Sequence, residues 1–200
     1  MSRIQRVSKK YPKLNDLGAV FAAPRYSECF SNLACDRTVF LCEDITKPLA
    51  SELGAMLIYL DQQNEEDIKV YVDTSGGDAQ ALCNILDIMN MVKSDISTIC
   101  IGKAFSAGAF ILSAGAPGKR YMLRHSMSMI HGIQAGVPSA VDHLQSENYI
   151  EFLKKHNNQL LKLLASRTNK TAAEVIKDCE RDVWLDARQS VEYGLADHIL

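Results

Sequence analysis

The sequence predicts an α/β protein with a mostly parallel sheet, and three observations support this fold class. Short runs rich in β-branched residues alternate with segments whose apolar residues recur at helical spacing. The 200 residues fit one domain, and 47% of them are hydrophobic, enough for a sizeable core. No internal repeat, linker or low-complexity tract divides the chain. We therefore expect a single domain over residues 1–200, with residues 1–30 as an N-terminal arm of weak periodicity.

Five segments have the character of strands. They contain Val, Ile, Thr or alternating apolar residues and stop at a turn residue, and the last two stop at His125 and His131. The segments are residues 37–45 (RTVFLCEDI), 67–74 (DIKVYVDT), 96–102 (ISTICIG), 119–125 (KRYMLRH) and 126–131 (SMSMIH).

Helices are predicted between and after these strands, because recognisable start signals precede apolar residues at helical spacing. The longest is expected to run from Ser139 to about Ser166, and Gly194 is expected to end the last one. The expected starts are, in chain order, Thr46 with Pro48, the Ser75–Gly77 turn, Ser106, Pro138 with Ser139, Thr171 and Asp186.

Composition excludes several classes of function. A formal net charge of −2 argues against a nucleic-acid-binding surface, and the longest apolar run, residues 104–115, is too short to span a bilayer. None of the six cysteines forms a C-x-x-C pair, and no histidine spacing suggests a zinc site, so no metal or other cofactor is expected. Cys42, Cys83 and Cys100 have the sequence context of small core residues, which indicates a reducing, cytoplasmic compartment.

Ser106 is the first candidate for chemistry, because it follows a predicted strand among small residues (GKAFSAGAF). The turn at Ser75–Gly77 follows the neighbouring predicted strand, and the carboxyl ends of parallel strands form the ligand-binding edge of such sheets. A helix start and a glycine turn both offer backbone N–H groups that can stabilise an oxyanion. The Ser75–Gly77 turn lacks the lysine of a phosphate-binding loop, so any ATP is expected to be handled by a partner.

A serine nucleophile needs a base and an orienting acid, and spacing alone leaves both open. His125 and His131 each end a predicted strand, whereas His143 and His156 on the long helix have the character of surface or packing residues. The order Ser…His…acid differs from that of α/β-hydrolases. The acid candidates are Asp178, Glu180, Asp182 and Asp186.

From about Ser31 to Leu200, the sequence resembles the ClpP family, the proteolytic subunits of the Clp protease. The likeness rests on three motifs in the family's order and spacing, which are GAFILSAGAPGKRYML (residues 108–123), MIH (129–131) and ERD (180–182) followed by VEYGL (191–195). It implies a serine endopeptidase that degrades unfolded polypeptides in an enclosed oligomeric chamber.

The resemblance also implies roles for particular residues. Ser106 matches the nucleophile, His131 the general base and Asp182 the orienting acid. Gly77 and Ala107 match the donors of the oxyanion-hole N–H groups, with Ala107 standing where the family usually has Met, and Arg181 resembles an arginine that couples ring contacts to the triad. The implied substrate-binding residues, alongside which a substrate strand would add, are Gly76, Gly132, Ile133 and Gln134.

At the level of assembly, the resemblance implies a crotonase-like head of repeated β-β-α units and a protruding handle helix at residues 139–166. This helix would interlock two stacked rings of seven, a tetradecamer made of this chain alone or mixed with a second ClpP-like subunit. An AAA+ unfoldase such as ClpX, or one of the ClpA/ClpC type, would thread unfolded protein into the chamber.

Besides Ala107, the chain departs from the family's pattern in other places. Ser75–Gly77 reads SGG where PGG is usual, Gly132–Ile133 replaces Gln-Pro after the histidine, and residues 1–30 do not match the family's axial hairpin. Two alternatives therefore stand beside the protease. One is a catalytically weak, structural subunit of a mixed ring, and the other is a crotonase-type acyl-CoA enzyme, which uses paired oxyanion N–H groups without a serine triad.

Overall fold

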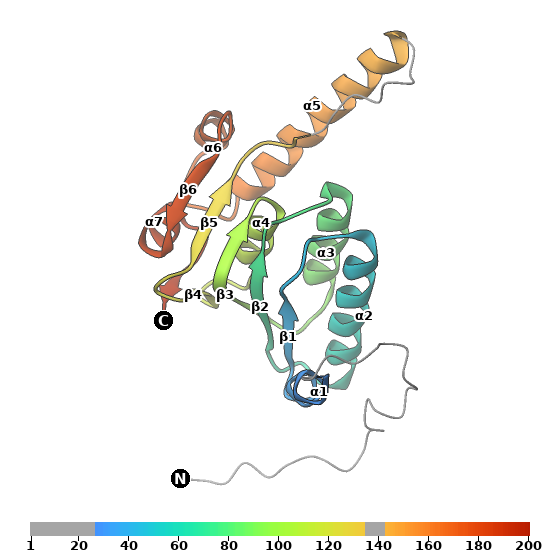
Figure 1. The fold of residues 1–200 in the computed structure, drawn as a ribbon, viewed down its shortest axis with the longest axis vertical. Coiled ribbons are helices and arrows are strands. Elements are labelled where there is room, and N and C mark those ends of the chain that lie inside the picture. Colours follow the sequence, from blue (N-terminus) through green and yellow to red (C-terminus); the bar gives the residue numbers. More distant parts are fainter. Residues whose placement is uncertain (1–26, 135–142) are drawn as a thin grey trace. The chain divides into compact units, whose positions relative to one another are not determined.

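The computed structural model describes residues 27–134 and 143–200, in two compact units, Met1–Asp36 and Arg37–Leu200. The described part of the first unit contains α1 (Ser27–Cys35), a helix that the sequence analysis does not predict. The rest of the expected N-terminal arm lies outside the described residues. The second unit contains all the strands of the described chain (Figure 1).

Within the described residues, seven strands form one sheet, as the α/β prediction requires. All pairs are parallel except β5–β6, which is antiparallel. The main path runs β1 (Thr38–Leu41), β2 (Ile68–Thr74), β3 (Ile96–Phe105), β4 (Arg120–Met122) and β7 (His198–Ile199), while β5 (Met127–Ile130) pairs with β3 and β6 (Val183–Asp186) pairs with β5.

The long strand β3 has two partners on one side. Thr98–Cys100 pair with β4, whereas Lys103–Phe105 pair with β5. Because β5 takes over where β4 stops, its carboxyl end lies beside the carboxyl end of β3. The residues that follow β3 and β5 are therefore neighbours at one edge of the sheet.

Among the described residues of this unit, six helices accompany the strands, and most of the predicted caps are formed. Thr46 accepts a hydrogen bond from the Leu49 N–H, Thr171 and Asp186 both form complete capping boxes, and Gly194 ends the last helix with a φ of 93°. The helices are α2 (Lys47–Gln63), α3 (Ala79–Met91), α4 (Ala107–Ser113), α5 (His143–Ala165), α6 (Ala172–Asp178) and α7 (Ala187–Tyr193).

The prediction for the long helix is tested only in part, because residues 135–142 are not described. The described helix α5 ends at Ala165, close to the predicted Ser166. Its buried residues begin only at Leu160, and they include Leu161 and Leu164. The described part of α5 before Leu160 carries mostly exposed side chains and runs away from the strands in Figure 1.

Several local predictions were wrong or incomplete. The strand expected at residues 37–45 is confined to β1, and Cys83, expected in the core, is only partly buried. The strand expected at residues 119–125 is confined to Arg120–Met122, since the Ser126 N–H donates to the Leu123 carbonyl (2.9 Å) and closes a turn. His125 is therefore an exposed turn residue. Cys42 was expected in the core but is exposed, because β1 ends at Leu41 and Cys42 no longer lies on its buried face. The short strands β6 and β7 were not predicted.

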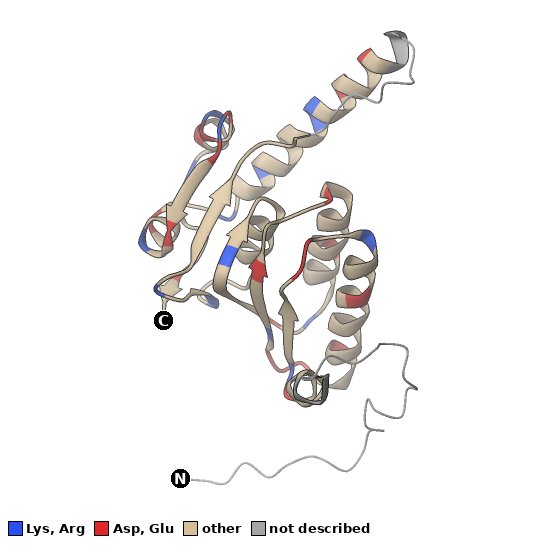
Figure 2. Cartoon of the chain, in the orientation of Figure 1, with Lys and Arg blue, Asp and Glu red and all other residues tan. Residues whose placement is uncertain are grey.

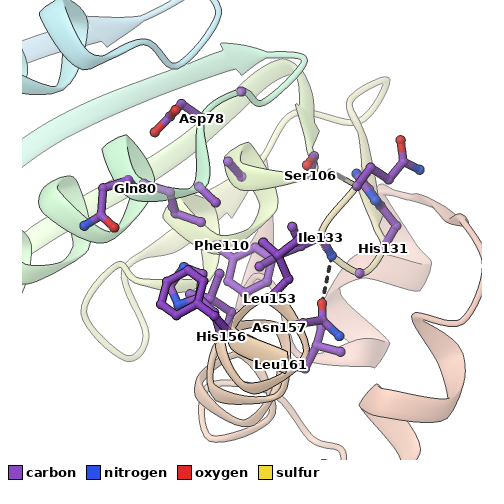
Figure 3. A pocket seen from close by; sticks show the side chains of 18 of the residues that line it. Asp78, Gln80, Ser106, Phe110, His131, Ile133, Leu153, His156, Asn157 and Leu161 are labelled. Carbon is purple, nitrogen blue, oxygen red and sulfur yellow. Dashed lines mark hydrogen bonds between the residues drawn. The ribbon is translucent and has the colours of Figure 1, made fainter. Parts of the chain in front are cut away.

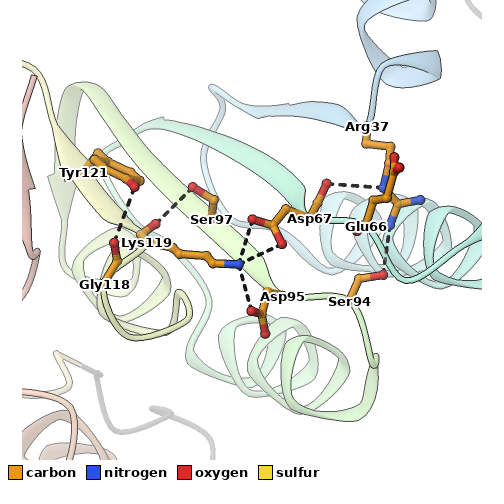
Figure 4. Close-up of polar contacts among 9 residues, drawn as sticks. All are labelled: Arg37, Glu66, Asp67, Ser94, Asp95, Ser97, Gly118, Lys119 and Tyr121. Atoms are coloured by element: carbon orange, nitrogen blue, oxygen red, sulfur yellow. Dashed lines mark hydrogen bonds and ion pairs between the residues drawn. The ribbon is translucent and has the colours of Figure 1, made fainter. Parts of the chain in front are cut away.

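The amino ends of the strands are fastened by polar contacts on the side of the sheet away from Ser106 (Figure 4). The Lys119 ammonium lies 2.8 Å from carboxylate oxygens of both Asp67 and Asp95, which precede β2 and β3. The buried guanidinium of Arg37 donates to the Leu60 carbonyl (2.7 Å) and to backbone carbonyls just before β2. These contacts hold the end of the sheet opposite the site.

Charged residues of both signs are interspersed over the described elements (Figure 2). No described element gathers a continuous basic stripe, in keeping with a formal net charge of −2. Across the described chain, no helix has the length and apolar character needed to cross a membrane.

Candidate active site

Ser106 occupies a sharp turn between β3 and α4. Its φ of 52° and ψ of −121° are unusual for a residue with a side chain, and such backbone conformations persist where the surrounding structure enforces them. The Ser106 N–H donates to the Met129 carbonyl of β5 over 2.7 Å. The turn is thereby tied directly to the strand that leads to His131.

The glycine turn after β2 lies against the serine turn, as the sequence analysis predicts. A Cβ added to Gly76 would lie 2.7 Å from the Ser106 Cβ and 2.8 Å from the Phe105 carbonyl oxygen, so only glycine allows this approach. The Gly76 N–H donates to the Thr74 hydroxyl (3.1 Å), which fixes the start of the turn.

Two backbone N–H groups beside Ser106 have no acceptor among the described residues. Gly76 and Asp78 form hydrogen bonds with Ile45 on either side of Gly77, both of 2.8 Å. The N–H of Gly77 between them, and that of Ala107 at the start of α4, have no acceptor among the described residues. Both residues line one pocket of about 520 Å³, so a developing oxyanion there would find two donors.

His131 lies on this pocket together with Ser106 (Figure 3). Phe105 of β3 is paired with Met129 of β5, and His131 follows Met129 by two residues. His125 precedes β5 instead, and lies about 20 Å of extended chain before His131. The parallel register thus brings His131, and not His125, to Ser106.

The hydrogen bonds of a catalytic triad are not made in this single chain. Among the described residues no hydrogen bond joins the Ser106 hydroxyl to the His131 ring, and the buried Nδ1 of His131 has no partner. Long or missing hydrogen bonds are common at hydrolytic sites without substrate. The unpartnered Nδ1 is the position that an orienting acid would occupy.

Asp182 is brought near His131 by strand pairing. Ile130 of β5 is opposite Val183 of β6, so His131 and Asp182 both lie just beyond the same end of the ladder. Asp182 is nevertheless exposed, its carboxylate makes no hydrogen bond to a described residue, and it does not line the pocket. Arg181 is likewise exposed and away from the pocket.

The other acid candidates have different surroundings. Asp178 accepts a hydrogen bond from the Tyr193 hydroxyl (3.0 Å), and Asp186 caps α7 through the Gln189 N–H. The Asp178 carboxylate contributes, after burial, to raising the pKa of Tyr193. Glu180 is exposed on the turn before Asp182. Structural duties therefore occupy two of the four candidates.

The other predicted substrate-binding residues divide between two pockets. Gly132, Ile133 and Gln134 line the pocket that holds Ser106, whereas Gly76 lines an adjoining depression with Ile45 and Lys47. The two pockets therefore take in all the predicted site residues except Arg181 and Asp182, which line neither of them.

Sequence reasoning missed one wall of the main pocket, which α5 supplies. His156 was expected to be a surface or packing residue, yet it lines the pocket and stacks on Phe152 with ring centroids 5.8 Å apart. The signal that could have revealed this wall is a helical stripe spaced by three or four residues. Its members are Tyr149, Leu153, His156, Asn157, Leu160 and Leu161.

No group of three or more His, Cys, Asp or Glu side chains within residues 27–134 and 143–200 has the arrangement of a metal site.

These features define a class of protein. The domain has a mostly parallel sheet, and its pocket holds a serine on a strained strand-to-helix turn, a histidine and two open N–H groups, which are the features of a serine hydrolase.

The family model described as Clp protease matches residues 22–200. The proteolytic subunit of the ATP-dependent Clp protease from Streptococcus sanguinis (strain SK36) is 38% identical over 177 residues, which are 88% of this chain and 90% of that protein. The subunit of the same name from Lactococcus lactis subsp. lactis (strain IL1403) is 37% identical over 88% of this chain and 89% of its own.

The chain belongs to the Clp protease family. This confirms the family expected from the motifs, the α/β fold class and the enzyme class, a Clp-type serine peptidase. It also favours the peptidase over the acyl-CoA alternative.

Proposed function

We propose that this chain hydrolyses peptide bonds with Ser106 as nucleophile, His131 as general base and Asp182 as orienting acid. The observation that carries the proposal is the common pocket of Ser106, His131, Gly77 and Ala107, with the last two N–H groups open. A strained serine turn beside a histidine and two such donors is the arrangement that acyl transfer requires.

In the proposed mechanism, the Ser106 oxygen attacks the carbonyl carbon of the scissile bond and its proton passes to His131. The N–H groups of Gly77 and Ala107 hold the oxyanion of the tetrahedral intermediate. His131 then gives the proton to the departing amine, which leaves an acyl-enzyme. Water, deprotonated by His131, releases the acid and restores Ser106.

Asp182 would complete this machinery by accepting a hydrogen bond from His131 Nδ1. Two observations support the assignment. The buried Nδ1 lacks any partner among the described residues, and the Ile130–Val183 pair brings the two chain segments together. His131 and Asp182 follow directly on this pair, so a change of side-chain rotamer is the movement expected to join them.

The substrate is expected to bind as an extended strand between the glycine turn at Gly76 and the segment Gly132–Gln134. Two observations support this placement: Gly76 lies directly against Ser106, and Gly132–Gln134 line the pocket that holds Ser106. The same arrangement favours unfolded polypeptides over folded ones, because only an extended chain offers its backbone on both sides.

The names of the relatives describe a subunit of an ATP-dependent protease, which supports an oligomer that works with an ATPase. We propose two stacked heptameric rings in the cytoplasm, of this chain alone or mixed with a second ClpP-like subunit, served by an AAA+ unfoldase. The exposed first half of the described α5 supports a role in ring contact. The exposed Arg181, beside Asp182, would link that contact to the triad.

A direct test is intact-protein mass spectrometry after treatment with a fluorophosphonate, with Ser106→Ala as the control. One adduct per chain, absent from the Ser106→Ala protein, is the expected result. An adduct that persists in the variant would overturn the assignment of Ser106.

A second candidate, a catalytically weak ring subunit, is favoured by one observation, the missing hydrogen bonds of His131 and Asp182 in the single chain. The same experiment separates the two. A chain that stays unlabelled both alone and in its assembled form would be a structural subunit.

A further inference from the structure

The segment that follows His131 is held by hydrogen bonds to two different parts of the chain. The Ile133 N–H donates to Oδ1 of Asn157 on α5 over 2.7 Å (Figure 3). The Gly132 N–H donates to the Cys179 carbonyl, at the end of α6, over 3.1 Å. The path of the chain leaving β5 is thus fixed from α5 on one side and from α6 on the other.

The fit around Gly132 is close. A Cβ at this position would lie 3.1 Å from the Asn157 Oδ1 and 3.4 Å from the Cys179 carbonyl oxygen. The distance to Asn157 is shorter than most real Cβ contacts. Asn157 and Cys179 can therefore approach the segment from both sides because residue 132 has no side chain.

This backbone anchoring matters for His131 because no hydrogen bond to a described residue holds its ring. Its buried Nδ1 has no hydrogen-bond partner among the described residues, and no hydrogen bond joins the ring to Ser106. The backbone at residues 131–133 therefore sets where the Cα–Cβ bond of His131 starts and in which direction it points. Small misplacements of a catalytic group lower the rate strongly.

We propose that Asn157 is a positioning residue, which orients His131 by fixing the Ile133 amide; the inference rests on the proposed role of His131. Gly132 and Ile133, which replace the family's usual Gln-Pro, both take part in this anchoring. A proline at position 133, as in the family's usual pattern, would have no N–H to donate, so Ile133 and Asn157 act as a pair. Asn157 is half-buried and lines the pocket from a helix that the motifs around Ser106 do not include.

The test compares Asn157→Ala, which removes the acceptor, with Asn157→Asp, which keeps an acceptor oxygen in nearly the same place. Asn158→Ala is the matched control, because Asn158 is the next residue of the same helix and is exposed. Each variant is prepared as the assembled full-length chain, and its native mass and melting temperature are compared with the wild type.

Two readouts are used, and one of them does not depend on activity. In hydrogen–deuterium exchange, Asn157→Ala should speed exchange in the peptide that contains Ile133, while Asn158→Ala should not. In kinetics with a small fluorogenic peptide, Asn157→Ala should lower kcat by about tenfold or more with KM nearly unchanged. Asn157→Asp should stay within about threefold of wild-type kcat.

The outcomes separate this inference from the proposed function. A wild-type chain that a fluorophosphonate does not modify at Ser106 would contradict the proposed function, and the exchange data would then decide on Asn157 alone. Unchanged exchange at Ile133 in Asn157→Ala would overturn the inference in either case. So would a rise in KM at constant kcat, since that would make Asn157 a substrate contact.

Discussion

Ile130 of β5 lies opposite Val183 of β6 in the antiparallel pair of the sheet. His131 and Asp182 are the next residues beyond that pair, and Phe105, which precedes Ser106, packs edge-on against Trp184 of the same β6 strand with ring centroids 5.0 Å apart. One short strand therefore connects the three proposed catalytic residues. The Asp182 carboxylate itself, however, makes no hydrogen bond to a described residue.

The first prediction concerns Asp182→Asn. Because Asp182 is exposed and makes no hydrogen bond to a described residue, the free energy of unfolding of the variant should lie within about 0.5 kcal/mol of the wild-type value. The rate at which a fluorophosphonate phosphonylates Ser106 should nevertheless fall by roughly 10²- to 10⁴-fold, since an orienting acid acts on the tautomer and direction of the histidine. The rate is measured by intact mass over time in the assembled protein.

Glu180→Gln is the control for Asp182→Asn, because it removes another exposed carboxylate from the same turn. In this control, the fluorophosphonate should modify Ser106 at the wild-type rate. Equal rates for all three proteins would exclude Asp182 as the acid.

The second prediction concerns the close approach of the two turns, tested by Gly76→Ala. Gly76 has a φ of 99°, and its added Cβ would press on the Ser106 Cβ. We expect the free energy of unfolding to fall by about 1–2 kcal/mol because of the backbone conformation alone. The rate at which a fluorophosphonate modifies Ser106 should fall by about 100-fold, because Ser106 must shift. Thermal unfolding and the kinetics of this modification measure the two effects separately.

Gly118→Ala is the matched control, since Gly118 has a φ of 80° but nothing within 4 Å of the added Cβ. Gly118→Ala should lose stability but keep the wild-type rate of Ser106 modification by the fluorophosphonate. If Gly76→Ala behaved in the same way as Gly118→Ala, the contact between the turns would not matter for Ser106.

Local signals in the sequence predicted much of this arrangement. The caps at Thr46, Thr171 and Asp186 act within a few residues, so the sequence pattern is sufficient to locate the helix starts. The juxtaposition of Ser106 and Gly77 was also predictable, because each follows one of two strands that are adjacent in the chain and in the sheet.

The rest depends on contacts between residues far apart in the chain. The choice of His131 over His125 follows from the β3–β5 register, in which Phe105 faces Met129, and no local pattern encodes that pairing. The Ile133–Asn157 hydrogen bond spans 24 residues. The residues on the α5 wall of the pocket, the polar His156 and Asn157 included, looked like ordinary helix positions, and only the docking of α5 gives them a role.

The third prediction concerns the cysteines. Burial raises the pKa of the Cys100 thiol to about 11 and that of Cys179 to about 12. Both are buried, whereas Cys42 is exposed. In the native protein at neutral pH, iodoacetamide should therefore modify Cys42 well before Cys100 or Cys179, because the thiolate is the reacting species and access is required. Peptide mass spectrometry after timed alkylation follows each site.

Denaturation provides the comparison for this alkylation experiment. In urea, the three thiols should react at similar rates, since the burial that separates them is gone. Native rates that were already equal would mean that Cys100 and Cys179 are accessible in the folded chain.

The last prediction concerns the ion pair of Arg120 on β4 with Asp197, whose side chains are only 12% and 18% exposed. Burial alone would raise the pKa of Asp197, but hydrogen bonds from the Arg120 side chain and backbone outweigh it and hold the pKa below its usual value. A carboxyl group whose pKa is lower in the folded state adds stability above its unfolded pKa of about 4, and this is lost as the pH falls through the folded value.

Asp197→Asn should therefore lower the stability at neutral pH by about 1–3 kcal/mol, because charged hydrogen bonds at a largely buried site are lost. Its melting temperature should also fall less steeply than that of the wild type as the pH drops below about 4. Asp95→Asn is the control, since the Asp95 side chain is 58% exposed and its partner Lys119 keeps Asp67. That variant should change stability by about 0.5 kcal/mol or less. Equal effects of the two substitutions at neutral pH, or an unchanged acid profile for Asp197→Asn, would mean that the Arg120–Asp197 pair contributes no more than a surface ion pair.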